Sequence, residues 1–302
     1  MEATVRRKFP HPQAVLWSLK NYIEVTKPRS VFLLVFTSLA TMLLAAREVD
    51  QMGAGFWFKA ILAITLACSG TNAVSCYIDR DLDAGMERTR RRPIPSGRIY
   101  PAEKALLWGV AQFVVASVIA WTINLPAFIC ILLGMFCYIG IYSLWLKRKT
   151  PWNIILGGVS GGLPAIFGWV AVTGKLSAVP VLTGILVILW IPNHIWNLAI
   201  YFKDDYQRVN VPMLPVVTQI KTTLLFILLT VVLMLLTSLA IYRYGGFGPV
   251  YLWTAVFCGA AIFAGNVYLY FRSENKKAWF LYKLSSPYLF LLFLGMLIDR
   301  FL

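Results

Sequence analysis

Nine apolar runs, each close to the length of a membrane-spanning helix, limit what this chain of 302 residues can fold into. A helix needs about 20 apolar residues to cross the hydrocarbon core of a bilayer. The runs cover residues 31–46, 56–78, 105–123, 127–146, 154–172, 179–200, 222–242, 249–271 and 279–298. We therefore predict an all-α polytopic membrane protein in a lipid bilayer, with residues 1–302 forming one domain.

The composition supports this fold class and excludes others. Hydrophobic residues make up 59% of the chain, with only 28 basic and 13 acidic residues, which is too little polar surface for a soluble protein of this size. The net charge of +15 is typical of nucleic-acid binders, but apolar runs separate the charges, so we expect no nucleic-acid partner. The five cysteines include no Cys-x-x-Cys pair, which argues against a disulfide framework or a structural zinc site.

Basic residues are distributed unequally between the two sides of the predicted bundle. Of the 28 Lys and Arg residues, 23 fall on the side of the N-terminus and 5 on the other. Because basic loops stay in the cytoplasm, we expect a cytoplasmic N-terminal arm (residues 1–26), cytoplasmic loops at 79–104 and 201–221, and an external C-terminus. No signal-peptide pattern precedes the first run, so a prokaryotic plasma membrane is the expected location.

The most informative motif follows the second run. Asn72, Ser75, Asp79 and Asp83 are spaced by three or four residues, which places them on one face of a helix that continues out of the membrane. Ionisable groups at such a position are costly and indicate function. Mg²⁺ binds one or two carboxylates and fills its other positions with water and phosphate oxygens. This motif therefore predicts a magnesium site that receives a phosphorylated substrate.

Basic residues near these carboxylates suit a diphosphate group. Arg88 and Arg92 follow the motif, and Lys147 and Arg148 close the fourth run. Guanidinium groups bind phosphate oxygens in pairs. The alternative for Lys147 and Arg148 is anchoring of a helix end at the membrane surface, and Asp81 is expected to be an ordinary solvated residue.

A second polar cluster closes the sixth run. His194, Asn197 and Asp205 recur at helical spacing, which predicts a shared face on that helix and its extension. The functional interpretation is a second half-site, with Asp204 or Asp205 reaching Mg²⁺ and Lys203 reaching phosphate. The alternative is an ordinary helix end, with His194 as a hydrogen-bonded interior residue. In the fifth run, we expect the glycines at 157–158, 161–162 and 168 to allow close helix packing.

Several stretches together resemble the UbiA superfamily of intramembrane prenyltransferases. Residues 76–83 (Cys-Tyr-Ile-Asp-Arg-Asp-Leu-Asp) and the Arg-Pro-Ile-Pro run at 92–95 resemble its first aspartate-rich motif. Residues 142–150 and 153–169 are similar to its central signature, and 205–217, with a Pro-Met-Leu-Pro run, to its second motif. The last two point to the branch that farnesylates haem. Ser75 stands where the family generally has Asn, and residues 202–204 replace an Arg-aromatic-Lys pattern.

The resemblance implies nine helices around a central cavity, with farnesyl diphosphate and haem B as substrates and Mg²⁺ as cofactor. It assigns Asp79, Asp83 and Asp205 to catalysis and Mg²⁺ binding, and His194, Asn197 or Tyr206 to haem contact or acid–base chemistry. The implied product is the hydroxyethylfarnesyl group of haem O. Candidate protein partners are haem-copper oxidase assembly factors and haem A synthase.

Three alternatives stay open at this point. A prenyltransferase of the same fold acts on a quinone precursor or a lipid alcohol. A membrane transporter uses broken helices and buried charge at the midplane, whereas the carboxylates here cluster at the ends of the runs. A haem-delivery scaffold binds haem without forming a product.

Overall fold

The structure is a computed structural model that describes residues 12–48, 52–272 and 274–302, so residues 1–11 of the predicted N-terminal arm lie outside it. In this part of the chain, nine helical spans are long and apolar enough to cross a membrane, and the all-α fold class is confirmed. The spans cover Pro28–Ala45, Ala54–Ile78, Glu103–Trp121, Leu125–Leu146, Asn153–Thr173, Ala178–Tyr201, Ile220–Gly245, Pro249–Arg272 and Asn275–Phe301. Each predicted run agrees with its span to within four residues.

Seven of the spans are single helices: α2 (Pro28–Ala45), α3 (Ala54–Ile78), α5 (Glu103–Trp121), α9 (Ala178–Tyr201), α12 (Ile220–Gly245), α13 (Pro249–Arg272) and α14 (Asn275–Phe301). The other two are divided, α6 (Leu125–Met135) continuing into η2 (Phe136–Leu146) and α7 (Asn153–Gly157) into α8 (Val159–Thr173). Short helices lie outside the spans: α1 (Pro12–Glu24), η1 (Ala46–Glu48), α4 (Arg80–Gly85), α10 (Lys203–Arg208) and α11 (Leu214–Val217).

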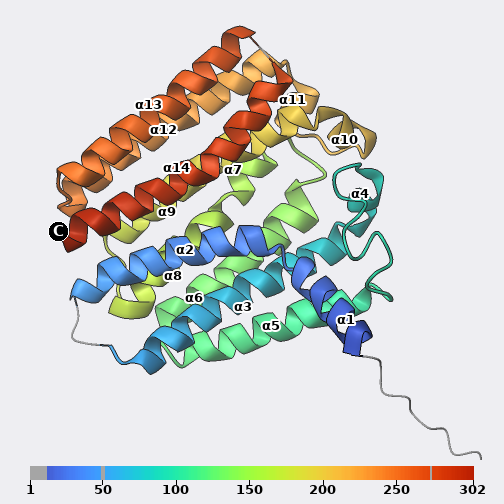
Figure 1. Cartoon of the computed structure of the whole chain (residues 1–302), viewed down its shortest axis with the longest axis horizontal. Helices are drawn as coiled ribbons and strands as arrows, with labels where there is room; N and C mark the ends of the chain where they lie inside the picture. The colour runs from blue at the N-terminus through green and yellow to red at the C-terminus, as the bar shows by residue number, and fades with distance from the viewer. Residues whose placement is uncertain (1–11, 49–51, 273) are drawn as a thin grey trace, which may run out of the picture.

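The spans pack into one bundle. Helices α12, α13 and α14 lie on one side with α9, and α3, α5 and α6 on the other, with α2 and α8 between them (Figure 1). The short helices α4 and α10 come together at one end of the bundle, although they are far apart in the sequence. We call this the carboxylate end, because Asp79, Asp83 and Asp205 lie there.

Close helix packing depends on glycine at several crossings. A Cβ added to Gly70 of α3 would lie 2.5 Å from the carbonyl oxygen of Gly109 on α5. One added to Gly162 of α8 would lie 2.5 Å from the carbonyl oxygen of Gly184 on α9, and one added to Gly168 would lie 2.0 Å from the carbonyl oxygen of Ser38 on α2. The predicted packing role of the glycines at 162 and 168 is confirmed. Small residues let backbones approach in this way inside membranes.

The second half of the fourth span is a π-helix, η2. Wider helical turns of this kind often occur at functional sites. The Lys147 N–H continues the pattern by bonding the Tyr142 carbonyl at 2.8 Å, five residues back. The Tyr142 ring packs over Gly157, where an added Cβ would lie 2.6 Å from the ring. The π-helix thus ends at Lys147, directly beside the carboxylate end.

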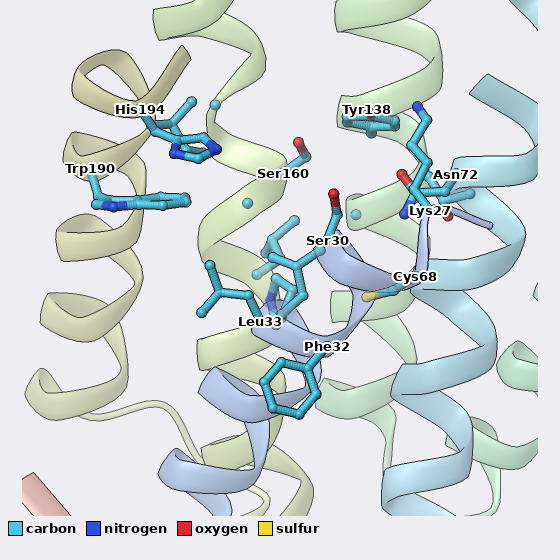
Figure 2. Close-up of a pocket in the computed structure, with 18 of the residues that line it drawn as sticks. Lys27, Ser30, Phe32, Leu33, Cys68, Asn72, Tyr138, Ser160, Trp190 and His194 are labelled. Atoms are coloured by element: carbon cyan, nitrogen blue, oxygen red, sulfur yellow. The ribbon is translucent and has the colours of Figure 1, made fainter. Parts of the chain in front are cut away.

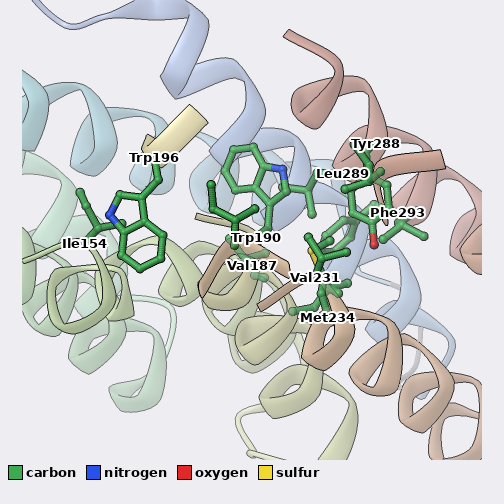
Figure 3. Packing of buried hydrophobic residues seen from close by; sticks show 14 of the residues in the cluster. Ile154, Val187, Trp190, Trp196, Val231, Met234, Tyr288, Leu289 and Phe293 are labelled. Atoms are coloured by element: carbon green, nitrogen blue, oxygen red, sulfur yellow. The ribbon is translucent and has the colours of Figure 1, made fainter. Parts of the chain in front are cut away.

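The largest group of buried apolar side chains joins α9, α12 and α14. Figure 3 shows part of it, in which aromatic and aliphatic side chains from the three helices fill the space between them: Val187, Trp190, Val231, Met234, Tyr288, Leu289 and Phe293. This packing fixes α9 against α14, and both helices contribute residues to the cavity described below.

Candidate active site

Asp79 lies where α3 ends and α4 begins. Its backbone (φ −88°, ψ 7°) departs from regular helix, yet its N–H still bonds the Ser75 carbonyl at 2.9 Å. The residue as a whole is 3% exposed. Its Oδ2 accepts hydrogen bonds from Lys147 Nζ at 2.6 Å and from Ser75 Oγ at 3.3 Å. A buried carboxylate is therefore paired with an ammonium group that comes from the end of the π-helix.

Asp83 keeps the predicted register with Asp79. Its N–H bonds the Asp79 carbonyl at 2.8 Å, and its side chain is 7% exposed. Arg92 Nη1 donates to both carboxylate oxygens, at 2.9 and 2.8 Å. Thr89 Oγ1 donates to the Asp83 carbonyl at 3.0 Å. These bonds fold the loop after α4 back onto the carboxylate, so the two acids of the first motif each hold one cation.

Asp205 connects the two aspartate-rich segments. It is 5% exposed, and its two oxygens accept the backbone N–H groups of Glu87 and Arg88, both at 3.1 Å. Arg208 Nη1 adds a weaker contact at 3.4 Å. Asp205 therefore holds the loop after α4 in place from the opposite side of the carboxylate end. Charge-assisted bonds of this kind are stronger than neutral ones.

The carboxylate end fits Mg²⁺ in one specific way. The second oxygen of Asp79, Oδ1, is buried and has no hydrogen-bond partner among the described residues, which is costly unless a ligand binds there. Among the described residues, no three His, Cys, Asp or Glu side chains gather closely enough to hold a metal ion. Because Mg²⁺ uses one or two carboxylates together with water and phosphate oxygens, these residues fit an ion that arrives with a diphosphate. They do not form a closed protein cage.

A cavity of about 770 Å³ opens beside these residues, within the size range of small-molecule sites. Its lining is mostly apolar and comes from α2, α3, α6, η2, α7, α8, α9 and α14. Figure 2 shows Lys27, Asn72 and Tyr138 on one side of this cavity, and Trp190 and His194 on the other. Asn72 lies about two helical turns before Asp79, so the polar side of the cavity leads toward the carboxylate end.

His194 lies against α14. Its Nδ1 is 2.6 Å from Ser285 Oγ, and its ring stacks on Trp190 and Tyr282, each with a centroid separation of 4.5 Å. His194 lines the cavity. His194 is thus hydrogen-bonded, as expected of an interior residue, and it is also accessible from the cavity, as a functional role requires.

The predicted shared face of His194, Asn197 and Asp205 is wrong. Helix α9 ends at Tyr201, and the backbone turns at Phe202 (φ −103°, ψ 34°) before α10 begins. Asp205 therefore points to the loop after α4. Asn197 is fully buried, does not line the cavity, and donates to Asn193 and Asn266 in a triad of amides.

The other predicted residues are spread around the carboxylate end. Arg148 binds the carboxylate of Asp81 at 2.7 Å through each of two nitrogens, and this exposed pair lowers the pKa of Asp81. Lys203 is half-buried, Asp204 is exposed and Tyr206 is buried, and none of these three lines the cavity.

Arg88 lies on the loop after α4, next to Phe202. The guanidinium group lies over the ring of Phe202, with its Cζ 5.4 Å from the ring centroid. Its Nε is buried and has no hydrogen-bond partner in the described part of the chain. A donor in this state is available to an anion that enters the carboxylate end, because a buried polar group without a partner is unfavourable.

Sequence reasoning missed two functional candidates. Lys27 precedes α2 in a left-handed conformation (φ 56°), lines the cavity, and places its Nζ 3.5 Å from Ser75 Oγ. The sequence signal for Lys27 is the Thr-Lys-Pro-Arg run at 26–29, directly before the first apolar run. Ser285, which positions His194, had no sequence signal, because only the packing of α14 on α9 brings the two together.

The fold and the site define an integral membrane protein that encloses an apolar cavity beside paired carboxylates and cations. The chain belongs to the UbiA prenyltransferase family, whose model matches residues 33–294, and it is a prenyltransferase. It is 54% identical over 283 residues to a protoheme IX farnesyltransferase of Desulforudis audaxviator (94% of this chain, 89% of the relative). A protoheme IX farnesyltransferase of Symbiobacterium thermophilum is 38% identical over 93% of this chain and 94% of its own length.

Solved structures share the fold. A structure of digeranylgeranylglyceryl phosphate synthase superposes with a TM-score of 0.77 at 19% identity, covering 94% of this chain and 98% of that one. A UbiA homologue from Archaeoglobus fulgidus, bound to GPP and Mg²⁺, gives a TM-score of 0.63 at 14% identity, covering 91% of this chain and 99% of that one.

Proposed function

We propose that this prenyltransferase joins the farnesyl group of farnesyl diphosphate to the 2-vinyl group of haem B and so forms haem O. The observation that carries the proposal is the apolar cavity, which adjoins a carboxylate end with a free Asp79 oxygen on one side and holds His194 on the other. The names of the relatives that are 54% and 38% identical support haem as the acceptor. A quinone precursor or a lipid alcohol is the alternative acceptor.

The diphosphate would bind at the carboxylate end. Asp79 and Asp83 would hold Mg²⁺, and a structural relative is bound to GPP and Mg²⁺. Bound there, Mg²⁺ would neutralise charge on the leaving diphosphate. Lys147 and Arg92 pair with the two carboxylates in the structure and would turn to the diphosphate oxygens, where Arg88 adds a third cation. Asp205 would keep the loop that carries Arg88 in position.

The proposed reaction transfers the farnesyl group as an allylic cation. The bond between C1 of the farnesyl group and the diphosphate oxygen breaks, and the electron pair leaves with the diphosphate. The vinyl group attacks the allylic cation with its terminal carbon, which forms the new carbon–carbon bond and a cation next to the porphyrin. Water adds to that cation and loses a proton, giving the hydroxyethylfarnesyl group. The apolar lining protects the allylic cation from early reaction with water.

The location follows from the distribution of charge. We propose that the carboxylate end faces the cytoplasm of a prokaryotic cell and that the C-terminus lies outside, because 23 of the 28 basic residues fall on that side. One end of farnesyl diphosphate is a charged diphosphate group, so its entry from the cytoplasm is consistent with this orientation. Fusing a reporter enzyme to each terminus tests it.

The direct test is product identification in a host that lacks haem O. Membranes that contain the chain should convert haem B and farnesyl diphosphate into haem O, identified by mass, and chelation of divalent cations should stop the reaction. Aromatic acids and lipid alcohols form parallel arms of the assay, and a prenylated product from one of them alone would refute haem as the acceptor. Asp79→Asn and Asp83→Asn should abolish product, and full activity of either variant would refute the site.

A further inference from the structure

The hydrogen bonds around His194 fix which nitrogen of its ring carries the proton. Ser285 Oγ donates to the Tyr282 carbonyl oxygen at 2.6 Å. A hydroxyl has one proton to give, so its oxygen must accept the bond from His194 Nδ1, 2.6 Å away. The neutral imidazole is therefore protonated on Nδ1. Its Nε2 then carries the lone pair, and no hydrogen bond to Nε2 occurs among the residues that the structure describes.

Two aromatic rings pack against this imidazole, and His194 also lines the cavity. Trp190 and Tyr282 stack on His194 at centroid separations of 4.5 Å, with interplanar angles of 21° and 34°. Figure 2 shows the imidazole above the indole of Trp190, at the edge of the cavity whose opposite side carries Lys27 and Asn72. A histidine whose Nδ1–H is held by a hydrogen bond and whose Nε2 is free is prepared to ligate a metal.

Two cations lie on the same cavity. Arg29 of α2 and Lys283 of α14 both line it and are exposed. Neither forms an ion pair with any residue that the structure describes. Lys283 follows Tyr282 directly, and its Nζ lies 5.0 Å from the ring centroid of Trp279. An acceptor with a flat apolar ring suits the apolar cavity. Its central metal suits His194, and its peripheral carboxylates suit Arg29 and Lys283.

We propose that haem B binds along the α9–α14 wall, with His194 Nε2 as the axial ligand of its iron and Arg29 and Lys283 as partners of its two propionates. The proposal rests on the proposed function, because it describes how that reaction takes its acceptor. It leaves the opposite wall, with Lys27 and Asn72, to the prenyl diphosphate. Ligation also fixes the ring in the cavity, so that its vinyl group meets the allylic cation in one orientation.

The iron ligand can be tested by binding alone, without farnesyl diphosphate. The full chain is purified in detergent with a tag that contains no histidine, and resonance Raman spectra of ferrous haem B report the iron–histidine bond. The sequence holds only two histidines, so His11→Ala is the matched control for His194→Ala. The wild type and His11→Ala should show the bond, and His194→Ala should lose it. Added imidazole should restore a nitrogen ligand to His194→Ala.

Ser285→Ala tests the positioning of the ligand. Loss of a hydrogen-bond partner behind a metal-ligating histidine commonly weakens metal binding about 10- to 100-fold. We expect haem B to bind more weakly to Ser285→Ala by this factor and the iron–histidine band to shift while remaining visible. An unshifted band with unchanged affinity would refute the positioning role.

The propionate partners can be tested with haem B and its dimethyl ester. Arg29→Gln and Lys283→Gln should each weaken the binding of haem B by about two- to fivefold, as expected for exposed ion pairs, and leave binding of the ester unchanged. Lys175→Gln, on the loop between α8 and α9, is the control and should change neither. Equal losses for haem B and its ester would overturn this part of the proposal.

The outcomes separate this inference from the proposed function. An unchanged iron–histidine band in His194→Ala, with haem O still formed, would overturn the ligand assignment and leave the reaction standing. A wild-type protein that binds no haem B and prenylates another acceptor would overturn both. Loss of the band in His194→Ala together with its return on adding imidazole would support the inference.

Discussion

Two neighbouring ion pairs allow the contribution of burial to be measured directly. Lys147 and Arg148 are adjacent in the chain and bind Asp79 and Asp81, respectively. The side chains of the first pair are 14% and 5% exposed, and those of the second are 42% and 59% exposed. The two pairs are thus close in the chain and differ mainly in burial, although Arg148 bonds its partner through two nitrogens and Lys147 through one. We predict that Lys147→Met destabilises the fold much more than Arg148→Met.

The expected magnitudes follow from what each substitution leaves behind. Lys147→Met leaves the charge of Asp79 buried with only the Ser75 hydroxyl as a partner, and breaking a buried pair in this way costs about 3–5 kcal/mol. Arg148→Met leaves Asp81 in solvent, where pairs contribute about 0–1 kcal/mol. At roughly 2 °C per kcal/mol for a large domain, the melting temperature should fall by about 6–10 °C for Lys147→Met and by at most about 2 °C for Arg148→Met.

The assay is thermal unfolding in detergent, followed by the fluorescence of the tryptophans. The double variant Asp79→Asn/Lys147→Met completes the comparison, because it removes both members of the buried pair. It should be more stable than Lys147→Met alone, since no buried charge is left without a partner. Equal shifts for Lys147→Met and Arg148→Met, or additive losses in the double variant, would refute the reasoning.

Three further predictions concern other parts of the molecule. Asp205→Asn should lower kcat/KM by about 10- to 100-fold in steady-state assays, because hydrogen bonds to a charged group contribute about 1.5–3 kcal/mol and each 1.36 kcal/mol is a factor of ten; an unchanged kcat/KM would contradict its role. Gly70→Ala should lower the melting temperature, since its Cβ would meet a backbone oxygen of α5 at 2.5 Å, whereas Gly134→Ala, with its nearest atom at 4.0 Å, should not. The hydrogen bond from Arg98 lowers the pKa of Glu24 below 4.5, so this contact stabilises the docking of α1 above about pH 4.5 and is lost as the pH falls through the lowered pKa. Proteolysis of α1 should therefore increase in acid, and Arg98→Gln should remove that dependence.

Most of the fold could be predicted from the sequence because bilayer thickness sets the length of an apolar helix. The nine spans follow from that single constraint. Two features did not follow from it: the π-helix that ends at Lys147 and the division of the fifth span at Gly158. Hydropathy reports the polarity of a segment. It does not indicate whether each backbone N–H bonds the carbonyl four residues earlier, as in an α-helix, or five residues earlier, as in a π-helix. The helix Pro12–Glu24 was likewise predicted only as part of an arm.

The candidate site was predicted less completely, and the reason is the distance between partners along the chain. Asp79 and Asp83 were found because helical spacing relates them. The partner of Asp79, Lys147, is 68 residues away and that of Asp205, the Arg88 N–H, 117 residues away, so no local pattern connects them. The prediction that Asp205 shares a face with His194 assumed one continuous helix, but α9 ends at Tyr201.

The placement of charge separates the two chemical stages of the proposed reaction. No Asp or Glu is among the described residues that line the cavity, whereas Tyr138 and Tyr142 are. A carboxylate facing an allylic cation would capture it as an ester or take its proton, and aromatic faces stabilise a cation without forming a bond to it. In the proposed reaction, the buried Asp79 and Asp83, each held by a cation, would act where the diphosphate leaves. The cation would then form next to a cavity whose described lining offers aromatic faces and no carboxylate.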